Sequence, residues 1–168
     1  LIAETGGQNA MIVDSSALPE QVVVDVVKSA FGSAGQRCSA LRVLFVQEDI
    51  KDKLLTMLVG AMQALQIGDP SLLATDVGPV IDDGARAVLQ AHADKMEKQA
   101  KLIYQMPLPA GLQDGCFFAP RVFEIDSLST LTEEVFGPVL HVVSFTAKDL
   151  DKVINDINAT GYGLTLGI

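Results

Sequence analysis

The chain has 168 residues, of which 49% are hydrophobic, and a mean hydropathy of +0.34. This composition is typical of one folded domain and argues against a disordered protein. The net charge of −9 argues against nucleic acid and anionic membranes as partners, because both are bound through clustered Lys and Arg. No run of about 18 apolar residues and no secretory signal is found, and two distant cysteines make a poor disulfide framework. We therefore expect a protein of the reducing cytoplasm.

Apolar runs alternate with amphipathic periods through the first half of the chain. We expect a buried strand at 10–13, a helix from 19 to 31 that stops at Gly32, and a strand at 41–46. Asp49 is expected to cap a long helix that ends at "IGDP" (67–70).

The second half continues the alternation. The patterns predict a helix at 83–99, a strand at 101–104, a surface loop at 106–115 and an extended segment at 117–125. A strand at 139–145, a helix at 150–157 and a last strand at 164–168 follow. Strands that alternate with helices indicate an α/β fold with a largely parallel sheet and one domain. Because the chain lacks an initiating Met and stops inside an apolar run, we expect it to be a piece of a longer polypeptide.

Three stretches place a reactive or charged residue beside glycine or proline: "ETGGQN" (4–9), "GSAGQRCSA" (32–40) and "EEVFGP" (133–138). Such residues let backbone approach a ligand closely. Taken singly, each stretch has a plainer interpretation. Cys38 would be a buried structural thiol, and Glu4 and Glu134 would be solvated surface acids.

In this order, the stretches resemble the aldehyde dehydrogenase superfamily. Its catalytic domain carries Glu-x-Gly-Gly, Gly-Gln-x-Cys and Glu-x-Phe-Gly-Pro, which appear here as "ETGG" from Glu4, "GQRC" ending at Cys38 and "EVFGP" from Glu134. The resemblance covers essentially the whole chain. "AETGGQNAMIVDSSAL" and "SAGQRCSALRVLF" are similar to L-glutamate-γ-semialdehyde (1-pyrroline-5-carboxylate) dehydrogenases, in particular to the module of bacterial bifunctional proline utilisation proteins. The resemblance implies that residues 1–168 form the catalytic domain and that the NAD-binding domain lies outside the chain.

The resemblance also implies a mechanism. A Cys38 thiolate would attack an aldehyde, and the resulting thiohemiacetal would pass a hydride to NAD and become a thioester. The N–H of Cys38 would form half of the oxyanion hole, whose other donor is an asparagine upstream of this chain. Glu4 would activate the water that hydrolyses the thioester.

Further roles follow from the same resemblance. Glu134 would hold the nicotinamide ribose hydroxyls, Phe136 would pack near the nicotinamide, and Thr5 and Gly6 would also contact the cofactor. Ser39 would bind the substrate carboxylate. Arg37 would assist the thiolate if its side chain points inward, and a solvated arginine is an equal alternative. For the longer protein the resemblance implies FAD in a separate proline dehydrogenase domain, and a homo-oligomer.

The remaining candidates are assigned no chemistry. We expect His92 to be packed or at the surface, His141 to face a polar neighbour within a strand, and Cys116 to be structural; no metal site is assigned. A different class, a cysteine hydrolase or acyltransferase, would need one of these histidines beside Cys38. An aldehyde dehydrogenase of other substrate range and an inactive fragment are further alternatives. The main hypothesis predicts that Glu4, Cys38 and Glu134 converge on one cleft edge.

Overall fold

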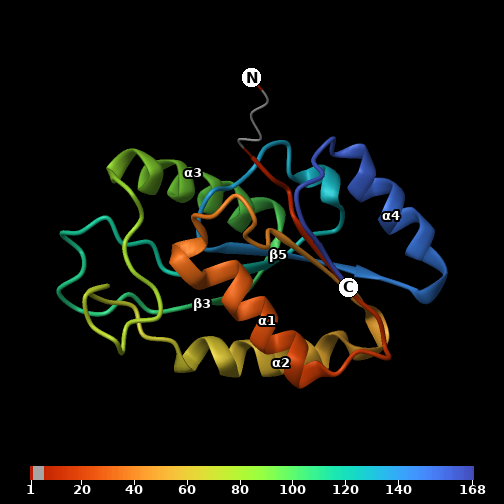
Figure 1. Cartoon of the computed structure of the whole chain (residues 1–168), viewed down its shortest axis with the longest axis horizontal. Coiled ribbons are helices and arrows are strands. Elements are labelled where there is room, and N and C mark those ends of the chain that lie inside the picture. The colour runs from red at the N-terminus through yellow and green to blue at the C-terminus, as the bar shows by residue number, and fades with distance from the viewer. Residues whose placement is uncertain (2–5) are drawn as a thin grey trace.

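The computed structural model describes residues 1 and 6–168. In this part of the chain, strands and helices follow one another as the sequence patterns indicate, with one sheet at the centre (Figure 1). The strands are β1 (Ala10–Val13), β2 (Val43–Gln47), β3 (Lys101–Gln105), β4 (Arg121–Glu124), β5 (Val139–Phe145) and β6 (Leu166–Gly167). The α-helices are α1 (Pro19–Phe31), α2 (Glu48–Ala64), α3 (Asp83–Gln99) and α4 (Leu150–Ala159), and short 3-10 segments occupy Gly32–Gly35, Leu128–Thr130 and Ala147–Asp149.

The sheet has the strand order β3-β4-β5-β2-β1-β6. Its pairings are parallel except at one edge, where β3 runs antiparallel to β4. The expected largely parallel α/β sheet is therefore confirmed. Within the described residues, no helix is long and apolar enough to cross a bilayer.

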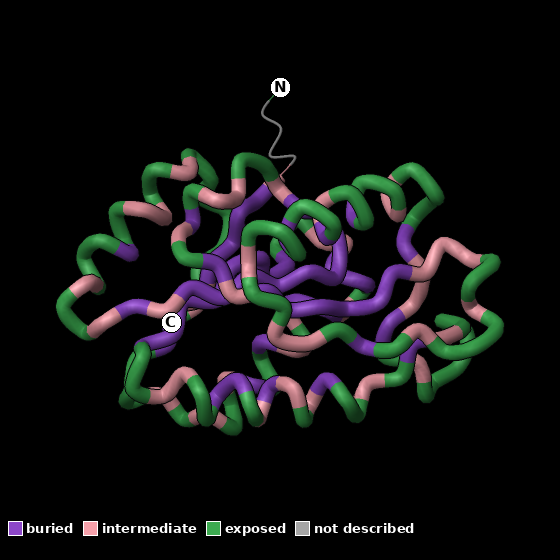
Figure 2. The backbone as a smooth tube through the Cα atoms, turned by 180° about the vertical axis from the view of Figure 1, so that it is seen from behind, coloured by how far each residue is buried: buried purple, intermediate pink, exposed green. Residues whose placement is uncertain are grey.

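Helices cover both faces of this sheet. α1 and α2 pack together on one face, while α3 and α4 lie on the other (Figure 1). Figure 2 shows the buried segments running through the middle of the molecule, with exposed positions on the outer turns of the helices. Because both faces of β2 are covered, all five of its residues are buried, and its first four form a continuous apolar run in the sequence.

Several boundaries differ from the expectations; α2, for example, ends at Ala64, before the "IGDP" stretch. Asp49 is not a cap, because α2 begins at Glu48 with Gln47 at the N-cap; Asp49 instead lies in the first turn, where an acid still favours the helix dipole. Strand β2 begins at Val43. Of the expected extended segment 117–125, only β4 pairs with other strands. This strand begins directly after Pro120, which has no backbone N–H to donate to a neighbouring strand. The last strand pairs with β1 only through Leu166 and Gly167.

The turn after α1 explains the glycine of "SAGQRC". Ser33, Ala34 and Gly35 have φ angles of 56°, 52° and 65°, three successive residues in the left-handed region. A Cβ on Gly35 would lie 2.2 Å from the carbonyl oxygen of Gly137. Gly35 therefore allows two backbone segments to pack closely: the segment before β2 and the segment before β5.

We predict that Gly35→Ala destabilises the fold by about 2–5 kcal/mol, the sum of about 1–2 for a left-handed alanine and about 1–3 for overpacking. Gly60→Ala is the matched control, because a Cβ at this position in α2 meets nothing within 4 Å. This control should stabilise by about 0.5–1 kcal/mol. Urea unfolding of the two variants measures both values, and an unchanged midpoint for Gly35→Ala would contradict the turn geometry.

Candidate active site

The three glycine-rich or proline-containing stretches meet at one edge of the sheet because of its topology. Residues 6–9 precede β1, residues 32–40 precede β2 and residues 133–138 precede β5. These strands are neighbours in the order β5-β2-β1 and run parallel, so their amino ends lie side by side. Segments more than 90 residues apart in the chain are thus brought together, as the ion pair from Arg42 to Glu134 shows.

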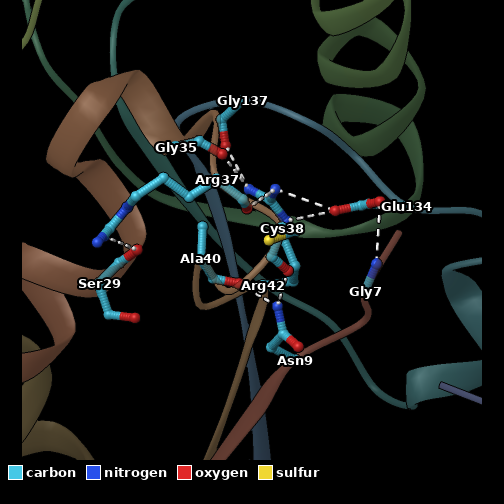
Figure 3. A network of polar contacts seen from close by, with 10 residues as sticks. All are labelled: Gly7, Asn9, Ser29, Gly35, Arg37, Cys38, Ala40, Arg42, Glu134 and Gly137. Carbon is cyan, nitrogen blue, oxygen red and sulfur yellow. Dashed lines mark hydrogen bonds and ion pairs between the residues drawn. The ribbon is translucent and has the colours of Figure 1, made fainter. Parts of the chain in front are cut away.

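Cys38 lies in the turn before β2, with an exposed side chain. Its carbonyl oxygen accepts a hydrogen bond of 2.7 Å from Nδ2 of Asn9, which also donates to the carbonyl of Ala40 at 2.8 Å (Figure 3). A Cβ on Gly7 would lie 2.8 Å from the Cys38 carbonyl oxygen, so glycine is needed there. The backbone of the thiol is therefore fixed while its sulfur stays accessible.

A buried arginine, Arg42, holds this edge together (Figure 3). Its Nη1 donates to the carbonyls of Gly35 (2.6 Å) and Gly137 (3.2 Å). Its Nη2 donates to the carbonyl of Arg37 (3.1 Å) and to Oε1 of Glu134 (3.1 Å), and its Nε reaches the same oxygen at 3.3 Å. Five N–H donors make five bonds, so the guanidinium is fully satisfied although only 1% of it is exposed.

Glu134 is bound through both carboxylate oxygens. Oε1 pairs with Arg42, and Oε2 accepts a hydrogen bond of 3.1 Å from the N–H of Gly7. Burial lowers the pKa of Arg42, and the Glu134 carboxylate opposes that shift. Phe136 is 43% exposed, with its ring centroid 5.1 Å from Cζ of Arg42, a cation–π contact.

The other residues expected in the site do not all lie within the described part of the chain. Glu4 and Thr5 lie outside the described residues, so their convergence with Cys38 stays a prediction. Gly6 borders the site, since a Cβ there would lie 2.9 Å from Oε2 of Glu134. Ser39 is exposed next to Cys38.

Arg37 extends away from the thiol toward the end of α1. Its Nη2 donates to two carbonyls in the last turn of that helix, that of Lys28 at 2.8 Å and that of Ser29 at 3.2 Å. Figure 3 shows the contact with Ser29. This geometry supports a helix-capping role for Arg37.

The two histidines contact each other. Nε2 of His92, on α3, lies 2.9 Å from Nε2 of His141, on β5, and Nδ1 of His141 lies 3.2 Å from the carbonyl oxygen of Arg42. The expected polar neighbour of His141 is thus another histidine. Among the described residues, neither histidine hydrogen-bonds to Cys38, so the geometry does not favour the Cys-His alternative. Nor does this part of the chain contain a cluster of three or more His, Cys, Asp or Glu that could hold a metal.

Sequence reasoning missed Arg42 and Asn9. A lone arginine in the apolar run "ALRVLFV" (40–46) was a usable signal, because arginine is almost never fully buried without a partner. Asn9 lies in "ETGGQN", but nothing in the sequence shows that its amide reaches the Cys38 carbonyl.

Comparison with known proteins agrees with this arrangement. The model of the aldehyde dehydrogenase family matches residues 1–168. The chain belongs to this family. It is 54% identical to the bifunctional protein PutA of Klebsiella aerogenes over 100% of its own length and 13% of the relative's, and 37% identical to the 1-pyrroline-5-carboxylate dehydrogenase of Geobacillus thermodenitrificans, over 98% and 32%.

A crystal structure of bifunctional proline utilization A superposes on this aldehyde dehydrogenase chain with a TM-score of 0.92 at 57% identity, covering 96% of the chain and 16% of the other protein. The chain thus spans less than a third of the length of these curated relatives. The resemblance read from the sequence motifs, both to the superfamily and to the proline utilisation module, is confirmed.

We predict that Arg42→Met destabilises this aldehyde dehydrogenase chain by about 3–5 kcal/mol, because it removes the partner of a largely buried carboxylate and of three carbonyls. The double variant Arg42→Met/Glu134→Gln should lose less than the sum of the single variants. Lys152→Met, which breaks the exposed pair with Asp156, is the control and should cost no more than about 0.5 kcal/mol. Urea unfolding measures the free energy of unfolding of the two single variants, the double variant and the control. A double variant that loses the full sum of the single losses would contradict the interaction between Arg42 and Glu134.

We also predict a pH dependence of stability from the histidine pair. Burial lowers the pKa of His92 to about 4 and that of His141 to about 3. The unfolded chain, with pKa values near 6.5, therefore binds more protons, and the free energy of unfolding falls as the pH drops below about 6.5. The decrease is at most about 1.4 kcal/mol per pH unit for each histidine.

Urea unfolding between about pH 7 and about pH 5 measures this slope above the range in which most carboxylates titrate. His92→Gln should make the slope distinctly shallower. The same slope in the variant and the parent would show that the histidine pair is not its source.

Proposed function

We propose that residues 1–168 form the thiol-bearing catalytic domain of an aldehyde dehydrogenase that oxidises L-glutamate γ-semialdehyde to L-glutamate, with its NAD-binding domain outside this chain. The observation that carries the proposal is the exposed Cys38, whose backbone is fixed by Asn9 and Arg42 beside the Glu134 segment. The substrate is supported by relatives named PutA and 1-pyrroline-5-carboxylate dehydrogenase.

In this mechanism Cys38 supplies the nucleophile. Its thiolate attacks the aldehyde carbon and forms a thiohemiacetal. The fixed Cys38 backbone presents its own N–H to the developing oxyanion, and the glycines around it leave room for the substrate. Once the thiohemiacetal has lost a hydride, the thioester is hydrolysed by a water that Glu4 deprotonates.

The residues around Glu134 fit a dinucleotide. The Glu134 carboxylate is 12% exposed and has one oxygen, Oε2, with a single protein donor, which leaves acceptor capacity for a ribose hydroxyl. Gly6 has no side chain to cover that oxygen, and Thr5 would contact the cofactor as well. Phe136 exposes its ring next to Arg42, where a nicotinamide can pack. When bound, NAD supplies the hydride acceptor.

The whole protein would then be a multifunctional enzyme of proline catabolism. We propose that it is a cytoplasmic homo-oligomer with FAD in a separate proline dehydrogenase domain. The word bifunctional in the names of its PutA relatives supports a second activity in the longer protein. The isolated 168 residues should not oxidise aldehyde with NAD, because hydride transfer requires a held nicotinamide.

Replacement of the thiol tests the nucleophile. Cys38→Ala in the protein that carries this segment should lower semialdehyde-dependent NADH formation by more than about a thousandfold, the usual effect of removing a covalent nucleophile. Cys116→Ala is the matched control and should retain activity, since the Cys116 thiol contacts Asp83 at 3.6 Å and no site residue. Substantial NADH formation by Cys38→Ala would refute the assignment.

Ser39 tests the substrate. A serine hydrogen bond to a carboxylate contributes about 1.5–3 kcal/mol, so Ser39→Ala should lower kcat/KM for the semialdehyde by about one to two orders of magnitude. Pentanal, which has no carboxylate, should be oxidised as before. Equal losses on both aldehydes would remove Ser39 as a specificity residue and leave the role of Cys38 standing.

A further inference from the structure

Arg121 is a second buried arginine, and it lines a pocket together with residues of α3. It is the first residue of β4 and is only 4% exposed. Its Nε donates a long hydrogen bond of 3.4 Å to the carbonyl of Ala119. In residues 6–168, no carboxylate lies within ion-pair distance of it, and neither Nη atom has a hydrogen-bond acceptor.

An arginine whose side chain is this deeply buried normally has a carboxylate partner, whereas the Nη atoms of Arg121 are not fully enclosed and open onto a pocket. Arg42 shows the ordinary solution in the same molecule, with all five donors bound. Arg121 has one partial compensation, the ring of Phe118, whose centroid lies 4.2 Å from its Cζ. The Phe118 ring contacts the flat face of the guanidinium, so it provides no acceptor for the N–H groups at the edge of the Arg121 guanidinium. Burial accordingly lowers the pKa of Arg121.

Arg121 lines a pocket of about 560 Å³ between α3, the β3–β4 edge and the loop 106–120. The wall contains the carboxamides of Gln90 and Gln105, and an apolar part made by Leu108, Phe117 and Phe118. A guanidinium edge matches a carboxylate bidentately, and the apolar wall suits a hydrocarbon or aromatic body of a ligand.

The charges around the pocket limit the ligand further. Arg86, also in the wall, is already bound to Asp83 at 2.9 Å and to the carbonyl of Gly115 at 3.3 Å. The carboxylates of Glu97 and Asp94 act on Arg121 from α3 without contacting it. A single unpaired positive charge near these acids favours a monoanion over a phosphate dianion.

We propose that the pocket at Arg121 binds a small organic monocarboxylate with an apolar body, at a site separate from Cys38. The carboxylate accepts hydrogen bonds from the free Nη edge, and the body of the ligand packs against Phe117 and Leu108. This site does not depend on the function proposed above.

Benzoate is the probe, and uncharged benzamide is its isosteric control. Isothermal titration should show that benzoate binds the wild-type protein and that benzamide binds at least about tenfold more weakly, as expected for a charge-assisted hydrogen-bond pair. Arg121→Met should weaken benzoate by at least about tenfold, whereas Arg86→Gln should change its affinity by less than about threefold. Equal binding of benzoate and benzamide, or unchanged binding by Arg121→Met, overturns the proposal. Tighter binding of inorganic phosphate than of benzoate at Arg121 overturns the assignment to a monocarboxylate.

A second measurement needs no variant and holds even if Arg121→Met fails to fold. In wild-type crystals soaked with 4-bromobenzoate, the anomalous signal of bromine should lie in the pocket beside Phe117, with the carboxylate on Arg121. A bromine found only elsewhere, such as in the cleft at Cys38, overturns the proposal.

Discussion

A single buried guanidinium connects the parts of this molecule that matter for its chemistry. Arg42 bonds to the turn before Cys38, to the carboxylate of Glu134 and to the backbone of Gly137. A buried charge is costly unless its hydrogen bonds are complete, so the native arrangement of all these segments is required at once. The left-handed turn at Ser33–Gly35 persists for the same reason, since the carbonyl of Gly35 is one of the acceptors.

The parallel sheet determines which segments Arg42 can reach. The segments before β1, β2 and β5 share an edge because these strands are adjacent and parallel. Open α/β sheets usually bind ligands at the carboxyl ends of their strands, and this site lies at the amino ends. The consequence is visible in the sequence, where each of the three glycine-rich or proline-containing stretches directly precedes an apolar strand.

Much of this arrangement could be predicted from the sequence. The helix at Pro19–Phe31 and the strand at Val139–Phe145 have the expected bounds because local periodicity, Pro19 and Gly32 all favour them. The cap of α2 could not be predicted, because N-cap preference favours Asp49 over Gln47, whereas the helix begins one residue before Asp49. The partners of Asn9 and Arg42 were also inaccessible, because long-range side-chain bonds depend on strand order. Arg121 illustrates the same limit, since its lack of an acceptor is visible only after folding.

Amide hydrogen exchange in Arg42→Met tests the central claim most directly. The N–H of Gly7 is bonded to Glu134, that of Ala40 to the carbonyl of Arg37, and that of Gly137 to the carbonyl of Val135. If Arg42 holds the three segments together, all three amides should lose protection jointly in the variant, while amides in the centre of β5 keep theirs. Loss of protection in the Cys38 turn alone, or in none of the three segments, would contradict the account.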